Sequence, residues 1–214
     1  MKQIKNNTHT ENNMEELYNI EALDNEKCIR YKLKIFTDSD TPSPREDDNL
    51  GRIIFANRIK KLGDDHDLID SQILANMQEN PKGILRCIVN KYEHGQISFS
   101  LSNKYPYDCR FDAGKCGYIE AKHSKIIDWF HDEGKPDEPL EKLLDRAKDF
   151  FEGELRTLTA WTNGDVYYFA LGSETFHGKP LDEDSCGGYY SIKDMCSEFP
   201  QCIIDKLRSE KIIS

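Results

Sequence analysis

From residue 84 to residue 101 the chain reads Ile-Leu-Arg-Cys-Ile-Val-Asn-Lys-Tyr-Glu-His-Gly-Gln-Ile-Ser-Phe-Ser-Leu. This stretch decides the fold class, because residues 84–90 and 96–101 are short and rich in apolar residues, as strands are. His94-Gly95 lies between them and predicts a turn, so the two strands are expected to form an antiparallel hairpin. Ile97, Phe99 and Leu101 occupy alternate positions and are expected to point inward.

The segments around this hairpin extend the pattern. Further strands are predicted at residues 29–36, 52–56, 117–121, 166–171 and 187–192, and helices at residues 68–77, 123–130, 140–158 and 200–213. The helix from residue 140 is the clearest, because its apolar residues recur at three- and four-residue steps. Strands arrive in runs without strict alternation with helices. The sequence therefore predicts an α+β fold with an antiparallel or mixed sheet and helices packed on one side.

The 214 residues suit one domain. Residues 1–25 are rich in Asn, Thr, Glu and Lys with little apolar periodicity, so they are expected to form a poorly ordered leader with a short helical stretch around residues 14–20. Residues 26–214 are then expected to form a single α+β domain.

Composition excludes several classes of protein. The longest apolar runs are only a few residues long, so no membrane span is expected. No apolar secretory segment is visible near the N-terminus, and the seven cysteines are odd in number and scattered, which together favour the cytosol. The formal net charge of −10 argues against broad nucleic-acid binding, because phosphates would be repelled.

One pattern suggests an enzyme. Asp108 or Asp112, followed by Glu120-Ala121-Lys122 at the end of an apolar strand, is typical of metal-dependent nucleases of the PD-(D/E)xK type. In such a centre the two carboxylates would hold Mg²⁺ and Lys122 would orient the attacking water. The alternative is an ordinary solvated pair of Glu and Lys at a strand end. No other cofactor or metal site is expected.

Acidic side chains form the other candidate site. Proteins that imitate DNA carry carboxylates at phosphate-like spacing over one face, and such groups steer and orient a basic partner. The alternative is a merely soluble acidic surface. The candidate partner-binding residues are Asp38, Asp40, Glu46, Asp47, Asp48, Asp64, Asp65 and Asp67, with an acidic loop at residues 182–184 as a further candidate.

Four blocks of the sequence resemble an uncharacterised protein family carried by bacteriophages and conjugative plasmids. They are Ser43-Pro44-Arg45-Glu46-Asp47-Asp48-Asn49-Leu50-Gly51 followed by Leu62-Gly63-Asp64; Phe111-Asp112-x-Gly114-x-x-Gly117-Tyr118-Ile119; Thr162-Asn163-Gly164-Asp165-Val166-Tyr167; and Asp184-Ser185-Cys186-Gly187-Gly188-Tyr189-Tyr190. Their order and spacing agree over roughly residues 31–190. The family typically has Trp where Asp47 and Gly187 stand, so a contact made by those aromatics in relatives would be lost or remodelled here.

The resemblance implies an accessory protein of a mobile element, acting in a bacterial cytoplasm. Accessory proteins of that kind often inhibit host defence, including restriction and CRISPR systems. The family does not usually carry a glutamate at the position of Glu120, which argues against a shared nuclease centre.

The leading hypothesis is therefore an acidic inhibitor or modulator that docks on a host nucleic-acid enzyme. The Mg²⁺-dependent nuclease is the alternative. A host-takeover or structural protein without an enzyme target is a third hypothesis that the sequence does not separate from the first.

Overall fold

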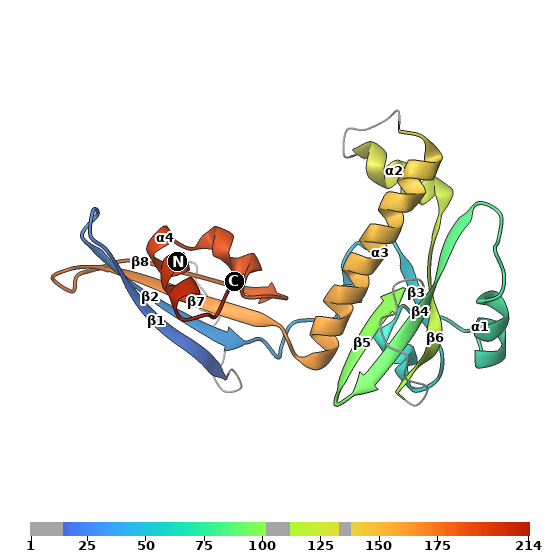
Figure 1. Ribbon diagram of the computed structural model, residues 1–214, viewed down its shortest axis with the longest axis horizontal. Helices are drawn as coiled ribbons and strands as arrows, with labels where there is room; N and C mark the ends of the chain where they lie inside the picture. The colour runs from blue at the N-terminus through green and yellow to red at the C-terminus, as the bar shows by residue number, and fades with distance from the viewer. Residues whose placement is uncertain (1–14, 102–111, 133–137) are drawn as a thin grey trace, which may run out of the picture. The chain divides into compact units, whose positions relative to one another are not determined.

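The computed structural model describes residues 15–101, 112–132 and 138–214 (Figure 1). Contacts divide the chain into two compact units. The terminal unit comprises Met1–Thr41 and Gly164–Ser214, and the inserted unit comprises Pro42–Asn163. The residues expected to form one domain from residue 26 are thus shared between two units, each with a sheet and a core of its own.

The terminal unit is a four-stranded antiparallel sheet in the order β1-β2-β7-β8. One face of this sheet is covered by the 3-10 helix η5 and the helix α4 (Figure 1). The elements are β1 (Glu16–Asp24), β2 (Ile29–Thr37), β7 (Tyr167–Thr175), β8 (Pro180–Tyr189), η5 (Asp194–Glu198) and α4 (Gln201–Ser209).

Alternation along β2 explains why the helices cover only one face. Leu33 and Ile35 are fully buried beneath η5 and α4, while Lys32 and Lys34, which alternate with them, are exposed on the other face. Successive side chains of a strand point to opposite faces, so a strand with this pattern has one dry face and one wet face.

The inserted unit is a second antiparallel sheet, in the order β3-β6-β4-β5, with helices on both faces. Its elements are η2 (Pro44–Glu46), β3 (Arg52–Phe55), η3 (Asn57–Leu62), α1 (Asp70–Asn76), β4 (Ile84–His94), β5 (Gln96–Leu101), β6 (Ala113–Lys122), α2 (His123–Asp132) and α3 (Leu140–Asn163). Figure 1 shows α3 and α1 on opposite sides of this sheet.

The larger core lies between α3, α2 and one face of this sheet. Ala147, Phe151 and Leu155 recur every four residues along α3 and are fully buried, so they form one stripe of the helix. On the opposite face of the sheet, α1 packs Ile73 against Ile54 and its neighbours. The predicted α+β class with antiparallel pairing is therefore confirmed, and α1 adds a helix on the second face.

Two predictions about local structure are wrong. Residues 16–24, expected to belong to a poorly ordered leader with a helical stretch, form strand β1 instead. The acidic residues 182–184, expected to form a loop, lie within strand β8. Both are outer strands with many polar residues, so their sequences alternate weakly, and pairing with β2 and β7 determines their conformation.

Candidate functional site

An acidic groove of about 460 Å³ lies in the inserted unit, between the loop that follows η2 and the middle of α3. The loop contributes Asp47, Asp48 and Asn49, and α3 contributes Asp149, Phe150, Gly153 and Thr157. Asp149, Gly153 and Thr157 are four residues apart, which places them on one face of the helix. The groove thus combines two of the predicted partner-binding residues with a helix face that the sequence analysis did not single out.

The loop is held in place by a buried arginine. The Arg45 side chain is only 6% exposed, and its guanidinium forms ion pairs with Asp64 (Nη2–Oδ2, 2.8 Å) and Glu154 (Nη1–Oε2, 2.9 Å). Nη2 also donates to the Gly51 carbonyl at 2.6 Å. One side chain therefore ties η2 to the start of β3 and to α3.

The two carboxylates also bond to main-chain groups. Glu154 Oε1 accepts from the Gly51 N–H at 2.9 Å, and Asp64 Oδ2 accepts from the Ile53 N–H at 2.6 Å. Burial raises the pKa of Glu154, and the hydrogen bonds from Gly51 and Arg45 partly offset that effect. We call Arg45, Asp64, Glu154 and the Gly51 main chain the arginine network.

Gly51 allows the loop to close on the core. A Cβ at this position would lie 2.5 Å from Ile119 Cδ1 and 2.9 Å from Phe151 Cε1, so a larger residue here would force these side chains to shift. Arg45, Gly51 and Asp64 therefore act together to hold the loop against the core.

Asp47 and Asp48 project from this rigid support into solvent. Both are exposed, and the Asn49 side-chain amide donates to the Pro44 and Asp47 carbonyls, which fixes the turn that carries them. Within the part of the chain that the structure describes, neither carboxylate forms an ion pair. Their charge is available to a partner, and Phe150, 36% exposed, adds apolar surface to the groove.

The remaining predicted acidic residues are distributed over both units. Asp38 and Asp40 lie in the terminal unit, where the Asp38 carboxylate accepts from the N–H groups of Gly188 and Asp40. Glu46, Asp65 and Asp67 are exposed in the inserted unit, outside the residues that line the groove. Asp64 is already engaged inside the unit by the arginine network.

Glu120, a residue of the predicted nuclease centre, is engaged by a neighbouring arginine. Its Oε2 lies 2.7 Å from Arg86 Nη2 and 2.8 Å from Arg86 Nε. Arg86 also donates to the Asn76 carbonyl at 2.6 Å and lies 4.5 Å from the centre of the Tyr118 ring. Glu120 therefore has a structural role, as the ion-pair partner of the buried Arg86 guanidinium.

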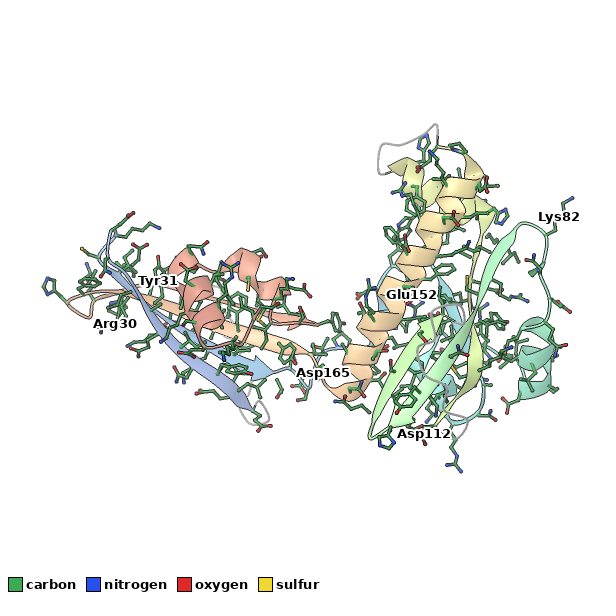
Figure 2. The ribbon with its side chains drawn as sticks, in the orientation of Figure 1. Arg30, Tyr31, Lys82, Asp112, Glu152 and Asp165 are labelled. Atoms are coloured by element: carbon green, nitrogen blue, oxygen red, sulfur yellow. The ribbon has the colours of Figure 1, made fainter. Side chains whose placement is uncertain are left out.

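Asp112 lies immediately before β6, at the opposite end of that strand from Glu120. Eight residues of extended chain separate it from Glu120, which corresponds to about 26 Å. Figure 2 shows this separation. Asp112 lies at one end of the sheet. Lys82 lies at the other end, where the start of β4 pairs with Lys122 at the end of β6. The expectation that Asp112 and Glu120 share a metal is therefore wrong, because strand geometry keeps them apart. Asp108 lies outside the described residues.

Residues 15–101, 112–132 and 138–214 contain no group of three His, Cys, Asp or Glu side chains arranged to hold a metal ion. The same residues include no helix long and apolar enough to cross a membrane. Comparison of the chain with protein-family models, with curated proteins and with solved structures gives no match.

Arg45 and Glu154, which support the site, were not predicted from the sequence. The four-residue spacing of Asp149, Gly153 and Thr157 on the polar side of a predicted helix was a visible signal for the helix face. The pairing of Arg45 with Glu154, 109 residues apart, had no comparable signal in the sequence.

Proposed function

We propose that this chain is a binding protein that docks through its acidic groove on a basic surface of a host nucleic-acid-directed defence enzyme, of restriction or CRISPR type, and inhibits or modulates it in the bacterial cytoplasm. The observation that carries the proposal is the pair of exposed carboxylates, Asp47 and Asp48, on a loop that follows a buried arginine with two ion pairs.

Rigid mounting matters because binding loses affinity when it has to order a mobile loop. The arginine network fixes the loop before the partner arrives, so the carboxylates meet Lys or Arg side chains without that loss. Fixed carboxylates of this kind raise the association rate and set the orientation of the complex more than they raise affinity. Phe150, 36% exposed beside them, supplies the apolar contact that affinity requires.

Two further observations support the choice of partner. Enzymes that act on nucleic acids have basic substrate channels, and a chain with a net charge of −10 is attracted to them while DNA itself is repelled. The resemblance to a family of phage and plasmid accessory proteins favours a defence enzyme among these targets.

Phage plating efficiency tests this proposal. We expect expression of the chain to raise plating at least tenfold on a host that carries the targeted restriction or CRISPR system, and to have no effect on the same host without it. The double variant Asp47→Lys/Asp48→Lys should lose the effect.

A matched control separates the groove from net charge. Each Asp→Lys or Glu→Lys change adds two charges, so the groove variant shifts the net charge from −10 to −6. Glu26→Lys/Glu79→Lys makes the same shift at two exposed positions outside the groove and should retain protection. Equal loss in both variants would show that bulk charge is responsible, and no protection by the wild-type chain against any defence system would contradict the proposed function.

A further inference from the structure

The outer strands of the two sheets differ in how far their free edges are covered. In the inserted unit, α3 covers the open edge of β5: the N–H groups of Ile97, Phe99 and Leu101 donate to side-chain oxygens of Asn163, Thr159 and Glu152 at 2.9, 3.0 and 3.2 Å. Figure 2 shows Glu152 on α3, beside this edge.

The other outer strand of that sheet is covered as well. Asp64 bonds to the Ile53 main chain in both directions, through its carboxylate and its own N–H. His66 Nε2 lies 3.0 Å from the Phe55 carbonyl. Edges closed in this way do not accept a further strand.

Strand β8 of the terminal unit is open by contrast. It pairs only with β7 among the described strands, and its residues are exposed from Pro180 to Gly188. Within the described residues, the side-chain acceptors of the Glu183 and Ser185 N–H groups are those of the preceding residues, Asp182 and Asp184, at 3.0 and 2.8 Å. Main-chain groups of alternate residues face the same side of a strand, so Glu183 and Ser185 present theirs at the free edge.

The charge on β8 determines what can pair there. Asp182, Glu183 and Asp184 are consecutive and exposed, and no described Lys, Arg or His forms an ion pair with them. Two copies of β8 paired antiparallel around Glu183 would place acidic residues opposite acidic residues, which destabilises a strand pair. A strand with Lys or Arg opposite these positions would be stabilised by the same geometry.

We infer that the free edge of β8 at residues 181–185 binds an extended, lysine- or arginine-rich peptide segment of a partner protein by strand addition. Main-chain hydrogen bonds at Glu183 and Ser185 supply the affinity, displacing the local contacts with Asp182 and Asp184, and the carboxylates select the basic sequence. This surface belongs to a different unit from the acidic groove, so the inference does not rest on the proposed function.

A nine-residue capped peptide of alternating Lys and Val tests the inference by calorimetry on the full chain. We expect binding that weakens at least tenfold when the peptide is N-methylated along one edge, because N-methylation preserves charge and removes strand pairing. Amide hydrogen exchange at Glu183 and Ser185 should slow when the unmodified peptide is bound. Equal binding of the N-methylated peptide would overturn the inference, since charge alone would then explain it.

A pair of variants tests the same edge from the protein side. Ser185→Pro removes an N–H at the free edge, where proline is tolerated, and Ser185→Ala retains it with the same charge. We expect at least a tenfold loss of binding for the first and no loss for the second. Asp47→Lys/Asp48→Lys should bind the peptide normally, and loss of binding there instead would overturn the assignment to β8. Self-association of the chain that Ser185→Pro abolishes would overturn the choice of occupant.

Discussion

Replacing Arg45 with methionine should destabilise the inserted unit by about 3 kcal/mol. Removing one partner of a buried ion pair costs about 3–5 kcal/mol, and this estimate is at the lower end. The change removes the ion pairs to Asp64 and Glu154 and the bond to the Gly51 carbonyl. The carboxylates that remain are only 23% and 11% exposed, so each loses its counter-charge in a place that water reaches poorly. The lower part of the range applies because Asp64 keeps some access to solvent.

Tryptophan fluorescence during urea unfolding reports this loss of stability from the inserted unit. The chain has two tryptophans, Trp129 and Trp161, and both lie in the inserted unit. A unit of this size is expected to have a urea dependence of about 2 kcal/mol per M, so the loss corresponds to a fall of about 1.5 M in the midpoint. Arg58→Met, at an exposed arginine of the same unit, is the control and should change stability by less than about 0.5 kcal/mol.

The double variant with Glu154→Gln refines the measurement. Neutralising Glu154 removes one of the stranded charges, so Arg45→Met should be less harmful in that background, with a coupling of about 1–3 kcal/mol. A loss below about 1 kcal/mol for Arg45→Met, or effects of the two substitutions that simply add, would refute the argument that the network holds the loop.

Four further predictions concern single residues. Gly153→Ala should stabilise the inserted unit by about 0.5–1 kcal/mol, because glycine is unfavourable in a helix interior. There is room for the added Cβ, since the nearest atom outside the local backbone is the Arg156 guanidinium at 3.8 Å. A lower unfolding midpoint would contradict this prediction. Carboxyl NMR titration should give Glu154 a midpoint above its ordinary pKa of 4.5. Its contribution to stability is therefore present below pH 4.5 and is lost as pH rises through the raised pKa. Glu174 should titrate below 4.5, because hydrogen bonds from Lys32 and Arg30 lower its pKa, and its contribution is lost as pH falls through the lowered value; midpoints in the opposite order would show the reasoning to be wrong. Glu120→Ala should destabilise the inserted unit by about 2–4 kcal/mol by stranding Arg86, whereas normal stability with loss of a Mg²⁺-dependent nuclease activity would support the alternative enzyme hypothesis.

The elements that the sequence predicted are those with strong internal periodicity. The helix from residue 140 was evident from its apolar steps, and α3 begins at that residue. The alternation at residues 29–36 and the turn at Gly95, which has a positive φ of 79°, were equally clear and correspond to β2 and the β4–β5 hairpin. In each case the pattern arises from neighbours within one element.

The elements that the sequence did not predict depend on distant partners. The sequence predicts neither β1 nor the acidic part of β8 as a strand, because an outer strand has few buried residues and takes its register from the adjacent strand. The division into two units was also missed. β2 and β7 pair along their whole length although the inserted unit separates them in sequence, and the Asp38 N–H donates to the Val166 carbonyl at 2.7 Å where the insertion begins and ends.

By itself, the sequence determined the α+β class, the position of the main helix and the concentration of acidic residues at 46–48, because these depend on composition and on spacing within short segments. Only the tertiary structure decided which carboxylates face solvent. Asp47 and Asp48 lie in the groove. Asp64, sixteen residues after Asp48, instead forms an ion pair with Arg45 and accepts a hydrogen bond from the Ile53 N–H. The physical reason is that burial and pairing of a charge are set by residues that fold against it, and for Asp64 these include an arginine nineteen positions away that also binds α3.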